Sequence, residues 1–385
     1  MPPPNKKEPG RAKVGRARRA AGGLSWRLPP LPWILNLARP VGLPAPRRIL
    51  VGGATQEALL LAKSLPGTEI VAIDPSEKLA RALRLSAKRR RLANLQSLQV
   101  SWDQQDFSEL VGGHFDLALL PGLPVGASRL APALRNLAGC MERPHGTIYL
   151  RVPGESHPYM RPADIFEAFG ESPRQADDAS LPSAALRLAA AMAGDAMPDE
   201  TPFPPILFSL GDWIGALESS GLRFVAALHV PGILARSLPV GGLEKLAPRS
   251  SRELALLLDQ IDAPVERHLI LGMSDYPEPP WSNPDLLAAW CPVIHFWPRT
   301  QIPIQSEPFN RLFSVDLEMQ RILPKLTLQL SAYMLELLRT ADGATPLRNM
   351  ISRIPHPATI QELLSALWFF HHGCILRLLP PREQS

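Results

Sequence analysis

The chain has 385 residues, of which 45% are hydrophobic and 20% charged, so we expect a sizeable core and two domains. No apolar run free of charges and prolines reaches the length of a membrane span. The three cysteines, Cys140, Cys291 and Cys374, lie far apart without a C-x-x-C pair, which argues against a disulfide framework or a zinc motif. We therefore expect a cytoplasmic protein that does not associate with membranes.

The formal net charge of +5 originates in a basic tail, residues 1–27. This tail holds eight Lys and Arg against one acid, Glu8, so the remaining chain has a charge of −2. Residues 1–24 show no hydrophobic period and are predicted to be disordered. A nucleic-acid or targeting arm is one interpretation. A solvated tail is favoured, because no aromatic residue alternates with the charges.

Residues 47–76 predict a strand, a small-residue turn, a helix and a second strand that ends in an acid. Gly52 and Gly53 form a turn that a ligand can approach closely, and the helix after it begins with unpaired N–H groups. A carboxylate at the position of Asp74 can accept hydrogen bonds from ribose hydroxyls. The alternatives are a tight turn without a ligand and a helix cap at Asp74.

Strand and helix patterns alternate through residue 152, which predicts βαβ units and a mostly parallel sheet. Strands are expected near 48–52, 69–73, 97–102, 115–120 and 146–152, and helices near 56–64, 76–92 and 128–141. A helix from Ser209 and two further strands, 222–229 and 268–273, then complete the sheet with an antiparallel end pair.

Four segments together resemble the class I S-adenosylmethionine-dependent methyltransferases, in particular bacterial ones with an extra C-terminal module. They are Leu31-Pro32-Trp33-Ile34, the run from Ile70 to Ser76, the run from His114 to Leu120, and Arg143-Pro144-His145-Gly146. The resemblance implies a Rossmann-like α/β fold and S-adenosyl-L-methionine as the cofactor.

The resemblance also implies a set of cofactor-binding residues. The turn and helix start would hold the methionine part of the cofactor, Asp74 its ribose, and Asp106 the adenine amino group, with Phe107 stacking on the ring. Asp103 is the alternative to Asp106, and either acid can instead be a solvated loop residue. The full expected set is Gly52, Gly53, Thr55, Gln56, Asp74, Asp106 and Phe107.

Two loops depart from the family pattern. The glycine loop reads Gly52-Gly53-Ala54-Thr55-Gln56, about two residues shorter than the family's Gly-x-Gly-x-Gly form. The loop 121–126 has no polar or histidine side chain to face a methyl group. Both departures favour a second hypothesis, a methyltransferase-like binding or scaffold protein with weak or lost catalysis. A nicotinamide dehydrogenase is disfavoured, since the loop has no third glycine.

The expected organisation is a tail at 1–27, a methyltransferase-like domain at 28–275, a Pro- and Trp-rich linker at 276–308 and a second unit at 309–380. Insertions are expected near 155–201 and 231–265. Helices near 315–323, 328–340, 345–352 and 359–372, followed by a strand at 375–379, predict a mainly helical, winged-helix-like unit.

Several partners and sites are judged from charge and spacing. The helix 359–372 contains no Lys or Arg, so sequence-specific DNA binding is not expected. The run Lys88-Arg89-Arg90-Arg91 is interpreted as a solvated helix end, with a nucleic-acid contact as the alternative. His371 and His372 are adjacent on a helix and point in different directions, so no metal site is expected. The methyl acceptor, a small molecule or a protein, and the catalytic residue stay unidentified.

Overall fold

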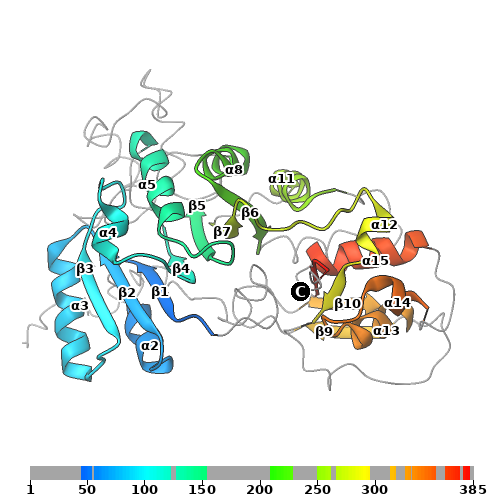
Figure 1. Cartoon of the computed structure of the whole chain (residues 1–385), viewed down its shortest axis with the longest axis horizontal. Coiled ribbons are helices and arrows are strands. Elements are labelled where there is room, and N and C mark those ends of the chain that lie inside the picture. Colours follow the sequence, from blue (N-terminus) through cyan, green and yellow to red (C-terminus); the bar gives the residue numbers. More distant parts are fainter. Residues whose placement is uncertain are drawn as a thin grey trace, which may run out of the picture.

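A seven-stranded sheet organises residues 48–273 of the computed structural model (Figure 1). The structure describes residues 45–53, 56–122, 127–153, 209–228, 249–261, 266–294, 313–317, 326–330, 332–352, 360–372 and 376–381. The basic tail, the insertion 155–201 and most of the insertion 231–265 lie outside these ranges, as does Thr359, the first residue of the expected helix 359–372.

The strands follow the order β3-β2-β1-β4-β5-β7-β6. The first five in this order are parallel, and β7 is antiparallel to both β5 and β6. Their bounds are β1 Arg48–Gly52, β2 Glu69–Asp74, β3 Leu95–Gln99, β4 Leu117–Leu120, β5 Thr147–Pro153, β6 Leu222–Ala227 and β7 Glu266–Met273. The expected Rossmann-like sheet, mostly parallel with an antiparallel end pair, is therefore confirmed.

Helices cover both faces of the sheet. One buried cluster joins alternate residues of β1, β2 and β4 to α2 and α3, and a larger cluster joins the other face to α4, α5, α8 and α11. These helices are α2 Gln56–Ser64, α3 Glu77–Arg90, α4 Phe107–Val111, α5 Ala127–Gly139, α8 Leu210–Ser219 and α11 Ser251–Ile261. Because both faces of the central strands are covered, Ile49–Val51 and Ile70–Ile73 are fully buried.

Local signals position the helices as the sequence predicts. Ser76 caps α3 by accepting a bond from the amide of Leu79, and Ser209 forms a reciprocal capping box with Asp212 at the start of α8. Gly221, with φ +82°, follows the end of α8.

The expected linker begins with folded structure. A short helix, α12 (Pro284–Leu287), and a strand, β8 (Cys291–Val293), lie within it, and β8 pairs with β11 (Arg377–Leu379) at the far end of the chain. Trp281, Leu287 and Trp290 belong to the same buried cluster as the sheet's second face. Residues 276–294 therefore pack on the two units instead of separating them.

The second unit contains a hairpin that the sequence analysis missed. Where helices were expected near 315–323 and from residue 328, the chain forms strands β9 (Phe313–Leu317) and β10 (Leu326–Leu330), which pair antiparallel. Both strands alternate apolar and polar residues, as in Phe313-Ser314-Val315-Asp316-Leu317, a period of two that favours a strand. The helices α13 (Ala332–Thr340), α14 (Leu347–Ile351) and α15 (Ile360–His372) then agree with expectation.

Candidate functional site

The strand order reverses between β1 and β4, because β1 pairs with β2 on one side and β4 on the other. In open α/β sheets, ligands bind outside the carboxyl ends of the strands at such a switch point. Gly53 lies at this point with φ +85°, and its amide donates to the carbonyl of Ile73 at 2.7 Å. This bond ties the turn after β1 to the end of β2. Ala54 and Thr55 lie outside the described residues, and Gln56 is the exposed first residue of α2.

Asp74 ends β2 at the same edge, one strand away from Gly53. Its side chain is 7% exposed, and its Oδ1 accepts a hydrogen bond from the amide of Ser76 at 2.8 Å. Asp74 therefore shapes the turn into α3, while Ser76 is the N-cap. A buried carboxylate at this position has the chemistry that a ribose diol needs.

Gly52 has a packing role inside the protein. A Cβ added there would lie 3.0 Å from both Leu120 Cδ2 and Trp102 Cζ2. Trp102 is 1% exposed and stacks on Phe107, with ring centroids 5.5 Å apart. The space above Gly52, on this face of the sheet, is therefore filled by the protein's own side chains.

The three residues considered for the adenine end have different environments. Phe107 is fully buried against Trp102. Asp106 is exposed, and its side chain does not cap α4 although it is the N-cap residue. Asp103 accepts a bond from Ser101 and forms an ion pair with Arg129 at 3.4 Å. Asp103 is thus held in place by its neighbours, and Asp106 is open to solvent.

Arg151 is a residue at this edge that sequence reasoning missed. It lies on β5 just beyond the last residue pair with β4, and its Nε donates to the carbonyl of Pro121 at 3.0 Å. It faces His268 of β7 in register, and the Nδ1 of His268 lies 2.6 Å from the hydroxyl of Tyr149. The sequence did hold a signal for this residue, because Arg151 is a cation that directly follows four mostly apolar residues of β5.

These residues fit one part of an S-adenosylmethionine site well. Asp74 and the Gly53 turn supply a buried acceptor and a close backbone approach at the switch point. At the adenine end only Asp106 is open, because Asp103 is paired and Phe107 is buried. The ribose position is therefore the best-formed part of the candidate site.

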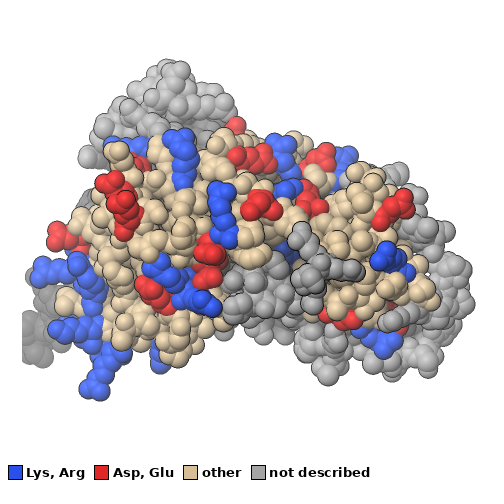
Figure 2. Space-filling model, viewed as in Figure 1, with Lys and Arg blue, Asp and Glu red and all other residues tan. Residues whose placement is uncertain are grey.

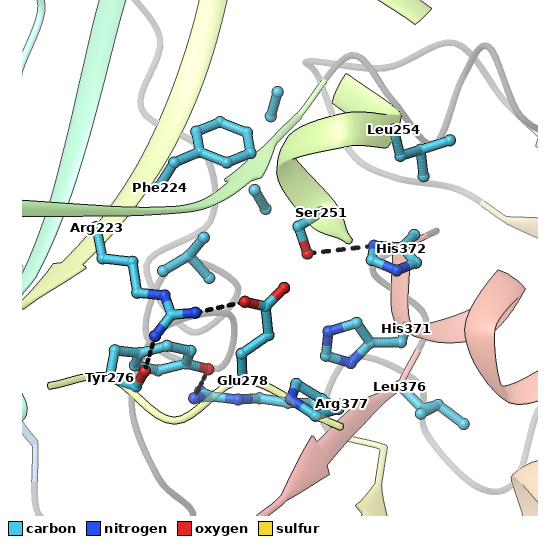
Figure 3. Close-up of a pocket in the computed structure, with 14 residues that line it drawn as sticks. Arg223, Phe224, Ser251, Leu254, Tyr276, Glu278, His371, His372, Leu376 and Arg377 are labelled. Carbon is cyan, nitrogen blue, oxygen red and sulfur yellow. Dashed lines mark hydrogen bonds and ion pairs between the residues drawn. The ribbon is translucent and has the colours of Figure 1, made fainter. Parts of the chain in front are cut away.

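A second polar constellation surrounds a pocket between the sheet and the C-terminal unit (Figure 3). Arg223 of β6 donates to the carbonyl of Tyr276 at 2.8 Å and pairs with Glu278. Arg377 of β11 donates to the Tyr276 hydroxyl, and its guanidinium lies 4.8 Å from that ring's centroid. The sequence analysis missed these four residues, since they are separated by up to 154 positions.

Two histidines of α15 complete the pocket wall. His372 Nδ1 lies 3.3 Å from Ser251 Oγ, and His371 Nδ1 accepts a bond from the amide of Leu378 at 3.4 Å. Burial lowers the pKa of His371 to about 4, and burial together with His371 holds the pKa of His372 well below its usual value. Burial also lowers the pKa of Arg377 to about 9. The histidines are therefore neutral at pH 7 beside two guanidinium groups.

Neither metal chemistry nor a reactive thiol is evident in the part of the chain that the structure describes. No group of three or more His, Cys, Asp or Glu side chains there is arranged to hold a metal ion. The described cysteines, Cys140 and Cys291, are buried and free, and burial raises the pKa of Cys140 to about 12. None of the described helices combines the length and hydrophobicity required to span a bilayer.

Comparisons with known proteins found distant structural likenesses. No family model and no curated protein matches the chain. Among solved structures, PKMT2 from Rickettsia typhi in complex with AdoHcy is 15% identical with a TM-score of 0.49, over 91% of this chain and 75% of that one. A trans-AT PKS O-methyltransferase of Brevibacillus brevis, in complex with S-adenosyl-L-homocysteine, is 11% identical with a TM-score of 0.36, over 64% and 72%.

A putative sarcosine dimethylglycine methyltransferase from Galdieria sulphuraria is 12% identical with a TM-score of 0.35, over 63% of this chain and 82% of that one. These likenesses are too distant to assign a ligand or an activity to this chain. Any function assigned to it therefore rests on the strand order and on the residues at the carboxyl edge of the sheet.

Proposed function

We propose that this chain is an S-adenosylmethionine-dependent methyltransferase whose acceptor is a small molecule or a protein. The observation that carries the proposal is the buried carboxylate of Asp74 beside the Gly53 turn at the switch point of the sheet. The sulfonium cofactor supplies an activated methyl group, so the protein has chiefly to bind it and align a nucleophile. Arg151 lies at the same edge, where it can contact an acceptor.

A second candidate function is a methyltransferase-like binding or scaffold protein. It is favoured by Trp102 and Leu120, which fill the space over Gly52, and by the pairing of Asp103 with Arg129. Both features reduce the room and the free hydrogen-bonding groups available to a nucleoside. The two functions differ in one measurable property, the affinity for the cofactor.

Calorimetric titration with S-adenosylmethionine tests the proposal. Asp74→Asn keeps an oxygen acceptor for the Ser76 amide while it removes the charge, so the turn is preserved. Loss of charge-assisted bonds of roughly 1.5–3 kcal/mol predicts binding about 10- to 100-fold weaker. Gly53→Val is less suitable, because φ +85° strains any side chain there.

Asp116→Asn is the matched control. Asp116 accepts bonds from the amides of Arg47 and Arg48, at 2.7 and 2.9 Å, at the opposite end of the sheet. Its replacement is expected to leave cofactor affinity unchanged. No heat of binding for the wild type at millimolar cofactor would support the scaffold function, and equal weakening in both variants would remove Asp74 from the site.

A further inference from the structure

The helix α3 and its C-cap, residues 77–91, carry an unusual concentration of positive charge. Seven Lys and Arg side chains are exposed there against one acid, Glu77. Figure 2 shows these cations gathered on the flank where Figure 1 places α3. The segment has a charge of +6 and the N-terminal tail +7, so the remaining chain is at −8. The cations are Lys78, Arg81, Arg84, Lys88, Arg89, Arg90 and Arg91.

Arginines elsewhere in the described structure are commonly neutralised by carboxylates. Arg48 pairs with Glu69, Arg129 with Asp103, and Arg267 with Asp259. Within the described ranges, by contrast, the six α3 cations from Arg81 to Arg91 take part in no ion pair. In the part of the chain that the structure describes, no ion pair therefore offsets the mutual repulsion of these six cations.

Folding of α3 does not explain this charge. The helix is held by its apolar stripe of Ala80, Leu83 and Ala87, which is buried against the sheet. Cations in the last turn suit the negative end of a helix dipole, but Lys78 lies in the first turn, where the dipole disfavours a cation. Arg81 and Arg84 lie mid-helix and gain little from either end. A polyanionic partner would offset the charge of the cations from Arg81 to Arg91.

We propose that α3 is a sequence-independent binding surface for the phosphate backbone of a nucleic-acid duplex. Lys78, Arg81, Lys88 and Arg89 follow one exposed stripe over about 16 Å, the axial length of about five phosphates of one strand. The helix contains no aromatic side chain on which unpaired bases stack, so its contacts are to the backbone.

A lipid surface is the less suitable partner. Membrane-surface helices bury an apolar face in the bilayer, whereas the apolar stripe of α3 is already covered by the sheet. Leu79 and Leu85, at 46% and 49% exposure, are the large apolar side chains that α3 leaves in solvent. The proposal is independent of the cofactor, because α3 covers a face of the sheet and does not form its carboxyl edge.

The test uses the full chain and a short mixed-sequence duplex, with binding measured by fluorescence anisotropy over a salt series. Arg81→Gln with Arg89→Gln removes two charges of this stripe and keeps good helix formers. The matched control, Arg135→Gln with Arg348→Gln, removes two exposed charges from α5 and α14. Circular dichroism establishes that both variants are folded.

About four phosphate contacts predict that affinity falls roughly 100-fold between about 50 and 200 mM salt. The α3 variant is expected to bind about tenfold more weakly at low salt, with a salt slope shallower by about 2, while the control changes less than twofold. Equal loss in the two variants, or no duplex binding at low salt, overturns the proposal. So does α3-dependent binding to phosphatidylglycerol vesicles in preference to the duplex.

Discussion

The carboxyl edge of the sheet and the junction pocket differ in how their residues are brought together. At the edge, Gly53 and Asp74 belong to one strand–helix–strand unit, and hydrogen bonds donated by the amides of Gly53 and Ser76 fix them. The pocket joins Arg223 and Glu278 to Arg377, which comes from the last strand of the chain. In the sheet, β6 beside the pocket lies four strands from β1, a separation of about 19 Å at the usual strand spacing.

This difference separates two kinds of function in the molecule. At the edge, Gly53 carries no side chain and has a positive φ, so a ligand can approach the backbone there. The pocket is crowded with charged and aromatic groups that bond to one another, and Trp368 of α15 donates to the carbonyl of Arg249 at 2.7 Å nearby. We therefore interpret the edge as the binding region and the pocket as the contact that holds the C-terminal unit on the sheet.

The largest expected effect comes from a buried ion pair between α11 and β7. Asp259 of α11 holds Arg267 of β7 through two bonds of 2.6 Å, and Arg267 is fully buried. Asp259→Ala removes both of these charge-assisted bonds from a buried guanidinium, which predicts a loss of about 3–5 kcal/mol in the free energy of unfolding. Denaturant titration measures it.

The matched control breaks an exposed ion pair that joins the same helix to α8. Arg252 and Glu218 are 3.5 Å apart with side chains 50% and 44% exposed. Glu218→Ala is expected to cost about 0–1 kcal/mol. Similar losses in the two variants would show that Asp259 does not compensate a buried charge.

The next effect is a pH dependence of the protein's stability, which is expected to arise at the pocket and not at the edge. Burial lowers the pKa of His371 to about 4, so between pH 6.5 and 4 the unfolded chain binds a proton that the folded chain does not. The contribution of His371 to the free energy of unfolding is therefore fully present above pH 6.5 and falls as the pH drops toward 4. The full shift corresponds to at most ~3 kcal/mol, and partial exposure of the ring reduces it.

Urea midpoints at pH 7 and pH 5 measure this effect. His371→Asn keeps an acceptor for the Leu378 amide and removes the titration, so it is expected to reduce the fall. His114→Asn, at an exposed histidine, is expected to leave the fall as in the wild type. If both variants lose stability equally at pH 5, His371 is not the group responsible.

The smallest effect concerns the edge, where Gly52 is interpreted as a packing glycine. Gly52→Ala places a methyl group 3.0 Å from Trp102 and Leu120, which predicts a loss of about 1–2 kcal/mol. In a Trp102→Phe background the same change is expected to cost less, with a coupling of at least ~0.5 kcal/mol. Strictly additive losses would indicate that Gly52 is small for another reason.

The sheet was predictable because its signals are local. Runs such as Ile70–Ile73 and caps such as Ser76 and Ser209 depend on neighbours a few residues away. Asp74 was identifiable in the same way, as an acid directly after a buried strand. The packing role of Trp102, by contrast, depends on its contact with Gly52, and no spacing in the sequence indicates that contact.

The C-terminal unit and the pocket were less predictable for the same reason. In β9 and β10 apolar and polar residues alternate, but these runs are short enough to be compatible with the end of a helix as well. Pairing between the two strands then favours the hairpin. In the sequence, Arg377 is a single cation within an apolar run. Its contact with Tyr276 forms only when β11, the last strand, pairs with β8. Tertiary contacts, which the sequence pattern does not encode locally, determine these features.

Hydrogen exchange of the backbone amides with and without saturating S-adenosylhomocysteine tests the central claim most directly. The account predicts added protection in residues 52–57, 74–76 and 101–107 at the carboxyl edge, and unchanged exchange in residues 223–228 and 371–378 around the junction pocket. Protection confined to the junction pocket, or no protection anywhere in the chain, would contradict the assignment of the carboxyl edge as the cofactor site.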